Sequence, residues 1–161
     1  MSSPYSEPAP ASGAPGGKTS FMNLDSNVGA MLCYILNFIC CLGLVLSIVF
    51  VITEKENRFV KFHALQSILL HVVFIILVIA VWLLTIVLVI AGAAASAASS
   101  SAGGAMGGIV GLLFSLIWLV VVVAYIGGLI FAAVKAYGGN MFKLPIIGNM
   151  AEKWSGGPVS A

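Results

Sequence analysis

The chain has 161 residues, of which 61% are hydrophobic and only 7% are charged, and its formal net charge is +2. A soluble domain usually carries about a quarter charged residues, because much of its surface must face water, so this composition excludes a soluble globular protein. The sequence has no basic patch interleaved with aromatic residues, which excludes a nucleic-acid partner. The expected fold class is an all-α integral membrane protein with the lipid bilayer as its solvent.

The first 22 residues are rich in Pro, Ser, Ala and Gly and show no apolar periodicity. Such a segment cannot bury enough apolar surface to offset its ordering entropy, so residues 1–22 are predicted to form a disordered tail. The segment also lacks the basic region of a signal peptide. A membrane domain is expected over 23–154, followed by a short tail over 155–161.

Three apolar runs are each long enough to cross a bilayer, since about 20 helical residues span its hydrocarbon core. The predicted transmembrane helices cover about 28–52, 62–91 and 109–134. A helix-start signal at Asp25 and Ser26 precedes the first helix. A polar hinge over 53–58 separates the first two helices, and a low-complexity run of Ala, Ser and Gly over 91–108 is expected to be a loop.

The basic residues predict the orientation of these helices. With three spans, one side of the membrane receives Lys55, Arg58, Lys61, Lys135, Lys143 and Lys153. The other side receives only Lys18, and the positive-inside rule then places the N-terminus outside and the C-terminus in the cytoplasm. A fourth helix made from the 91–108 run would split this asymmetry, which argues against it.

Four polar residues share one face of the second helix where it enters the bilayer: His63, Gln66, Ser67 and His71. One interpretation of this stripe is a proton-sensitive gate or a polar groove for a substrate, because an ionisable group inside a membrane is costly and often functional. The other is a neutral histidine that hydrogen-bonds between helices. The lack of an intramembrane acid as a relay partner favours the second.

Three neutral polar residues, one in each span, lie at similar depth in the outer half of the membrane. Asn37, Thr85 and Ser115 are therefore predicted to hydrogen-bond between helices and to fix their register. The three cysteines, Cys33, Cys40 and Cys41, fall in one apolar run and are expected to be packing residues.

Small residues at four-residue spacing predict close helix packing in the third span. One row is Gly103, Gly107, Gly111 and Ser115, and the other is Ala124, Gly128, Ala132 and Ala136. Nine helical residues separate the two rows, so they face opposite ways. One row would pack inside the protomer and the other against a second copy, although Gly and Ala are also common in membrane helices generally.

The last segment predicts a short amphipathic helix over 145–154 that lies at the membrane surface. Pro145 suits the first turn of a helix. Ile147, Met150, Ala151 and Trp154 then share one face, with Trp154 as an interfacial anchor.

No nucleophile motif, carboxylate pair, phosphate-binding loop or set of metal ligands occurs in the sequence. We therefore expect no enzymatic activity, no catalytic residues, no metal and no cofactor. The favoured function is that of a non-enzymatic scaffold or accessory subunit, with another membrane protein or a second copy as its partner. The alternative is a small oligomeric channel, transporter or translocation component.

Two motifs carry a resemblance to a known family. They are the run EKENRFVKFHALQS at 54–67 and the sequence KAY at 135–137 followed by FKLPIIGNMAE at 142–152. Over residues 25–154 the chain resembles a family of small, functionally uncharacterised prokaryotic membrane proteins with three spans. Its members are often described as similar to the Tic-type component of chloroplast protein import. The resemblance implies a multi-pass protein of the prokaryotic cytoplasmic membrane, and the family has no agreed activity.

Overall fold

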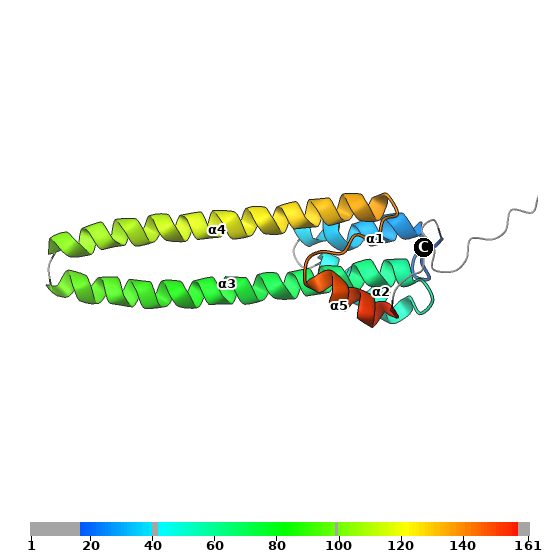
Figure 1. The fold of residues 1–161 in the computed structure, drawn as a ribbon, viewed down its shortest axis with the longest axis horizontal. Coiled ribbons are helices and arrows are strands. Elements are labelled where there is room, and N and C mark those ends of the chain that lie inside the picture. Colours follow the sequence, from blue (N-terminus) through cyan, green and yellow to red (C-terminus); the bar gives the residue numbers. More distant parts are fainter. Residues whose placement is uncertain (1–16, 40–41, 99, 158–161) are drawn as a thin grey trace, which may run out of the picture. The chain divides into compact units, whose positions relative to one another are not determined.

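A computed structural model describes residues 17–39, 42–98 and 100–157, and these residues form helices joined by short loops (Figure 1). The elements are α1 (Ser26–Ile35), the 3₁₀ helix η1 (Leu36–Phe38), α2 (Leu42–Thr53), α3 (Arg58–Ala98), α4 (Ser100–Tyr137) and α5 (Ile147–Ser155). Within the described ranges there is no strand, only one isolated β-bridge between Lys18 and Asp25. The all-helical prediction is confirmed. Most of the predicted tail and Cys40 and Cys41 lie outside the described residues.

The chain divides into two compact units, and α3 and α4 each run through both. The first unit, called the core unit here, comprises Met1–Leu70 and Leu129–Ala161. The second, called the apolar unit, is His71–Gly128 and contains no Asp, Glu, Lys or Arg. Every charged residue of the sequence therefore belongs to the core unit.

The first predicted span is not one helix but two short antiparallel helices, α1 and α2, joined through η1. A Cβ atom on Gly29 would lie 3.4 Å from Cζ of Phe50, and one on Gly43 would lie 2.5 Å from the backbone N of Asn37. The start of α1 thus packs on the end of α2. The prediction of a continuous helix over 28–52 is wrong, because apolar length does not reveal a turn made of equally apolar residues.

The two ends of this helical hairpin lie side by side. The Glu54 carboxylate accepts hydrogen bonds from the Ser20 N–H (2.6 Å), the Ser20 hydroxyl (3.1 Å) and the Phe21 N–H (3.3 Å). The Asn57 amide donates to the Ser26 hydroxyl at 2.7 Å. The segment before α1 is therefore fixed to the hinge after α2.

The helices α3 and α4 are both longer than predicted. The expected loop over 91–108 is helical as far as Ala98 and again from Ser100, so that prediction is wrong. Alanine has the highest helix propensity, and a run rich in it extends a helix that tertiary contacts have already started. Two helical segments, Arg58–Ala94 and Gly107–Tyr137, are long and apolar enough to cross a membrane; α1 with η1, and α2, are too short to qualify. Three spans are thus not confirmed.

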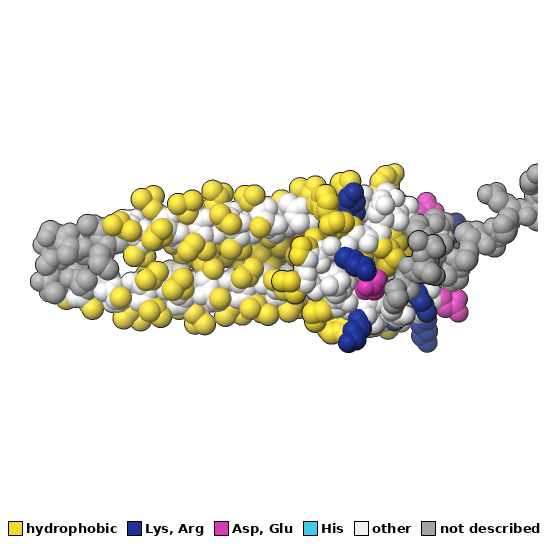
Figure 2. All heavy atoms as spheres, viewed as in Figure 1, with side chains coloured by type: hydrophobic (Ala, Val, Ile, Leu, Met, Phe, Trp, Pro, Cys, Tyr) yellow, Lys and Arg dark blue, Asp and Glu magenta, His cyan; other side chains and the backbone are white. Residues whose placement is uncertain are grey.

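In the apolar unit, each helix turns only one narrow stripe of side chains inward. On α3 the less exposed residues follow each other at intervals of three and four: His71, Phe74, Val78, Val81, Thr85 and Leu88. On α4 they are Phe114, Trp118, Val121, Val122 and Tyr125. This is the spacing of a coiled-coil seam. Apart from the half-buried Val110, the other apolar side chains that the structure describes in this unit are exposed, and Figure 2 shows hydrophobic side chains along the described part of the two helices.

Candidate functional site

Three of the four predicted stripe residues, His63, Gln66 and Ser67, are buried together in the core unit. The Tyr34 hydroxyl lies 3.1 Å from His63 Nδ1 and accepts a hydrogen bond from Gln66 Nε2 at 3.2 Å. These contacts join α1 to α3. The His63 ring also lies edge-on to Phe59 and Phe62, with ring centroids 4.7 and 5.1 Å away. Among the described residues, His63 Nε2 has no hydrogen-bond partner.

Gln66 also holds the loop between α4 and α5. Its Nε2 donates to the Phe142 carbonyl at 3.2 Å, and its Oε1 accepts from the Leu144 N–H at 3.3 Å. Because one side chain bonds the backbone on both sides of Lys143, it fixes both the position and the direction of this loop.

Ser67 also joins α3 to α1 and to the 3₁₀ helix η1. Its hydroxyl donates to the Cys33 carbonyl at 2.7 Å, and the Asn37 amide donates to the same carbonyl and to Ser67 Oγ, each at 3.0 Å. The predicted interhelical bond of Asn37 therefore exists, and its partner is on α3. Buried polar groups that are bonded in this way fix helix register.

Thr85 and Ser115 do not join Asn37. The Thr85 hydroxyl donates to the Val81 carbonyl at 2.7 Å, and the Ser115 hydroxyl donates to the Gly111 carbonyl at 2.9 Å. Both bonds stay within one helix, as short hydroxyl side chains readily do when lipid surrounds them. The predicted set of three bonds between helices is wrong for these two residues.

His71, the fourth stripe residue, belongs to the apolar unit and has a different partner. Its Nδ1 lies 2.9 Å from the Tyr125 hydroxyl of α4. The Tyr125 ring stacks on Phe74, with centroids 4.0 Å apart and planes inclined by 16°. The stripe thus splits into a buried cluster of three residues and a separate histidine–tyrosine pair.

The two small-residue rows have different surroundings. Ala132 and Ala136 are buried in the core unit, whereas Ala124 is exposed. A Cβ on Gly107, Gly111 or Gly128 would meet nothing within 4 Å. Within the protomer, only the C-terminal end of the second row takes part in close packing.

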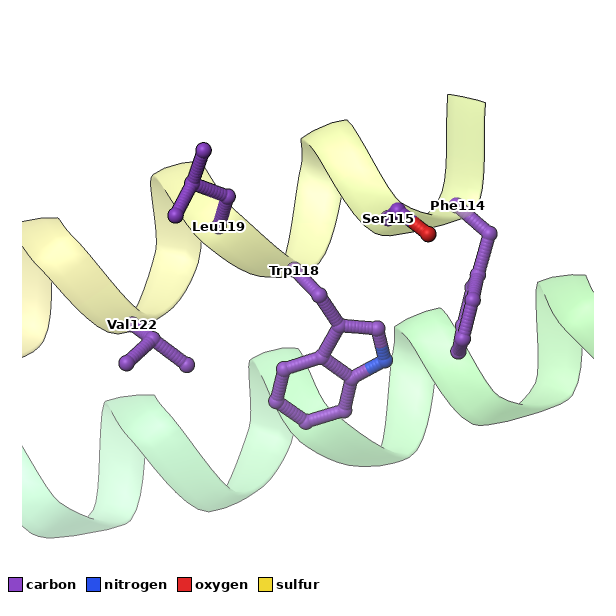
Figure 3. Close-up of a pocket in the computed structure, with 5 residues that line it drawn as sticks. All are labelled: Phe114, Ser115, Trp118, Leu119 and Val122. Carbon is purple, nitrogen blue, oxygen red and sulfur yellow. The ribbon is translucent and has the colours of Figure 1, made fainter. Parts of the chain in front are cut away.

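Beside the first row, α4 has an open hollow of about 430 Å³ lined by Phe114, Ser115, Trp118, Leu119 and Val122. Figure 3 shows Trp118 and Phe114 extending from α4 on the side where α3 is drawn, and Leu119 pointing away. Its lining is almost wholly apolar and comes from a single helix. The part of the chain that the structure describes contains no group of three or more His, Cys, Asp or Glu side chains that could hold a metal ion.

Residues 25–151 match the magnetosome magnetite crystal formation protein family. The chain belongs to this family. It is 37% identical over 139 residues to a UPF0132 membrane protein of Methanocaldococcus jannaschii, a match that covers 86% of this chain and 96% of the relative. It is 32% identical over 134 residues to a UPF0132 membrane protein of Archaeoglobus fulgidus, covering 83% of this chain and 99% of the relative. No solved structure matches the chain.

Membership of the magnetosome magnetite crystal formation protein family confirms the coarse part of the predicted resemblance, a small prokaryotic membrane protein. The names of these relatives refer to a membrane protein and not to chloroplast import. The family match covers the first motif completely and the second motif up to Ala151. Gln66 of the first motif hydrogen-bonds to Phe142 and Leu144 of the second, so the two motifs meet in space.

Two tyrosines of this family member were missed by the sequence reasoning. Tyr34 and Tyr125 each supply the hydroxyl that meets one histidine of the predicted stripe. A signal was present, since a buried tyrosine hydroxyl in an apolar helix needs a hydrogen-bond partner. Pairing the two tyrosines with the two histidines would have used that signal.

Proposed function

We propose that this family member is a non-enzymatic scaffold or accessory subunit of a membrane complex. One observation carries the proposal: the long helices of the apolar unit expose apolar side chains almost all round, while Tyr34–His63, Asn37–Ser67 and His71–Tyr125 pair polar side chains between elements. Such a surface is complementary to lipid tails and to other apolar helices. It offers no pair of an activated nucleophile and a base.

In this proposal the protein crosses the membrane twice, through α3 and α4, and the α1–α2 hairpin enters and leaves on one side. At about 1.5 Å per residue, a helix of 10 to 12 residues spans only about half of the hydrocarbon core. Lys18 precedes the hairpin, and its carbonyl lies 3.4 Å from the Asn57 amide. All seven basic residues then share one side, which the positive-inside rule makes cytoplasmic.

Labelling of single cysteines tests this topology against the three-span alternative. In a chain whose native cysteines are replaced, Lys18→Cys and Lys55→Cys should be protected from an impermeant thiol reagent added outside intact cells. Ala97→Cys should react. Reaction of Lys18→Cys together with Ala97→Cys would restore three spans and place the N-terminus outside.

The scaffold role is tested by the mass of the particle that contains the protein after gentle solubilisation. We expect a complex with other membrane proteins that survives crosslinking in the native membrane. Gly111→Leu fills an open position on the outer face of α4 and should weaken partner binding without unfolding the protomer. Leu112→Ala, at a neighbouring exposed position, is the control. A lone monomer in wild type and variants contradicts the proposal.

The name of the family associates its members with magnetite crystal formation. A membrane scaffold that holds other proteins in place is a role that such a process can use. From the family we apply only the membrane location to this chain, because the proposed scaffold role rests on the surfaces of its helices.

A channel or transporter is the second candidate, and the His71–Tyr125 pair favours it. An ionisable side chain between two membrane helices is expensive and commonly functional. Proton or ion flux into liposomes separates the two functions. In a channel gated by this histidine, His71→Gln and His71→Leu should both abolish pH-dependent flux. In a scaffold, wild type should show no flux, and only His71→Leu should disturb packing.

A further inference from the structure

The loop and helix after α4 contain a strained, exposed turn that the scaffold role does not use. Ile146 has φ 68° and ψ −60°, and the Ile147 N–H donates to the Pro145 carbonyl at 2.8 Å. This is a γ-turn with a positive φ at its centre, a rare conformation that costs energy in any residue with a β-carbon and most in a β-branched one. The Ile146 side chain is nevertheless 82% exposed.

Ile146 begins a row of exposed apolar residues that continues along α5. Met150 and Trp154 follow at four-residue intervals and are 41% and 55% exposed. Ile147 and Ala151, on the adjacent face of the same helix, are buried in the core unit. The sequence assigned Ile147, Met150, Ala151 and Trp154 to one membrane-facing surface, and the structure divides them between two faces. The outer row is Ile146, Met150 and Trp154.

The rest of the core unit holds this row in place. Gln66 bonds the backbone on both sides of Lys143, and the Gly148 N–H donates to the Leu144 carbonyl at 2.8 Å. Gly148 packs so closely on Lys143 that a Cβ there would lie 2.7 Å from its Cα. A turn that is strained and yet fixed from several directions is a feature often kept for function.

Lysine side chains accompany the row. Lys135 lies in the last turn of α4, Lys143 in the connecting loop and Lys153 in the last turn of α5. In Figure 2, basic side chains are visible over the end of α4, the connecting loop and α5. Lys143 also pairs with Glu152 at 2.7 Å, so the three cations and one acid leave a surplus of positive charge.

We propose that the outer row and these lysines form a binding surface for anionic phospholipids on the side of the membrane where the basic residues lie. The three apolar side chains enter the boundary between headgroups and acyl chains, and the lysines meet the phosphate groups. Interfacial helices combine these two interactions, and Trp is the residue that most favours this level of the bilayer. The loop over 138–146 connects α5 to α4, and α4 contains a segment, Gly107–Tyr137, that is long enough to cross the membrane. This inference does not depend on the scaffold role.

Fluorescence of Trp154 in the full-length protein tests the proposal. Trp82→Phe and Trp118→Phe leave Trp154 as the sole tryptophan, and the protein is reconstituted into vesicles of phosphatidylcholine alone or mixed with phosphatidylglycerol. We expect quenching by phospholipids brominated near the headgroup, with a several-fold stronger effect in the anionic vesicles that salt reduces. Inorganic phosphate added to neutral vesicles should not reproduce the gain.

Variants separate lipid binding from folding. Lys135→Gln with Lys153→Gln should remove most of the gain in anionic vesicles, whereas Lys55→Gln, on the hinge, should not. Ile146→Gly introduces a residue that tolerates the positive φ, so the protein should stay folded. Because the variant removes one apolar side chain of the outer row, quenching of Trp154 should fall. Equal quenching in neutral and anionic vesicles, or quenching by aqueous iodide alone, would overturn the proposal.

Discussion

The two units of this protein are built by different rules. Every buried hydrophobic side chain among the described residues belongs to the core unit, and so does every charged residue of the sequence. The apolar unit has neither, although its helices are the more hydrophobic. In water, apolar length predicts burial, but lipid is as apolar as a leucine side chain, so a membrane helix gains little by hiding one. Hydrophobicity therefore indicates where this chain meets lipid and not where its core is.

Hydrogen bonds divide in the same way. In the core unit, Gln66, Ser67 and Asn37 each bond a different element. In the apolar unit, Thr85 and Ser115 bond their own helices, and the His71–Tyr125 pair joins α3 to α4. Polar contacts between elements thus add to apolar packing in the core unit, and substitutions that remove polar groups should affect the two units unequally.

The largest effect is expected from Gln66→Leu. The new side chain leaves the Phe142 carbonyl and the Leu144 N–H, both half-buried, without their partner, and an orphaned group costs about 1–3 kcal/mol when water cannot reach it. We expect a loss of about 4 kcal/mol in the free energy of unfolding by the same reckoning. Denaturant titration in detergent measures this loss, and proteolysis of the loop over 138–146 should accelerate.

Thr85→Val is the matched control in the apolar unit, since its hydroxyl bonds only the Val81 carbonyl of the same helix. Its effect should stay below about 1 kcal/mol, because that carbonyl keeps its place in the helix. Equal losses in the free energy of unfolding for the two variants would show that polar side chains contribute equally to the stability of both units.

The sequence predicts some features of the core unit and the apolar unit and not others. Composition and apolar length predict an all-helical chain with membrane-spanning helices, and the structure has two helices that are long and apolar enough. Helical spacing placed His63, Gln66 and Ser67 on one face, and these three residues are buried together. The hairpin at 28–52 was missed because its turn is as apolar as the helices that it joins. The contact of Gln66 with residues 142–144 bridges about half of the chain, and no local pattern contains such a pairing. The helical class was therefore predictable, whereas a turn made of apolar residues and the pairing of distant segments were not.

One glycine from each unit extends the comparison, because substitution with alanine should lower the free energy of unfolding at Gly43 and raise it at Gly111. Gly43→Ala would bring a Cβ to within 2.5 Å of the Asn37 backbone N, so the turn of the hairpin must shift. We expect a loss of about 2 kcal/mol, as for other overpacked sites. Gly111→Ala meets open space and should gain up to about 1 kcal/mol from helix propensity. Unfolding titrations of both variants in one detergent decide the point, and a stabilised Gly43→Ala would rule out the close contact.

A smaller effect is expected where the segment before α1 meets the hinge. Glu54→Ala removes the acceptor of three hydrogen bonds, to the Ser20 N–H and hydroxyl and to the Phe21 N–H. Because Ser20 and Phe21 are exposed, water replaces part of the loss, and we expect about 1.5 kcal/mol, the low end for hydrogen bonds to a charged group. Faster trypsin cleavage after Lys18, with unchanged cleavage after Lys135, would show that the release is local.

The smallest expected effect is a gain in the free energy of unfolding on substitution of Ile146. This effect separates the contribution of Ile146 to folding from its contribution to lipid binding. Ile146→Gly relieves the cost of a positive φ in a β-branched residue, about 1–3 kcal/mol, and increases the entropy of the unfolded chain by less. Little buried surface is lost, since the Ile146 side chain is 82% exposed. In a non-ionic detergent, which lacks anionic phospholipid headgroups, the variant should therefore be about 1 kcal/mol more stable than wild type. Ile146→Ala keeps a Cβ in the strained turn and should gain less.

In anionic vesicles the advantage of the glycine variant should shrink, because the wild-type side chain there has lipid to enter. A glycine variant that is less stable than wild type in detergent would mean that Ile146 serves the fold itself.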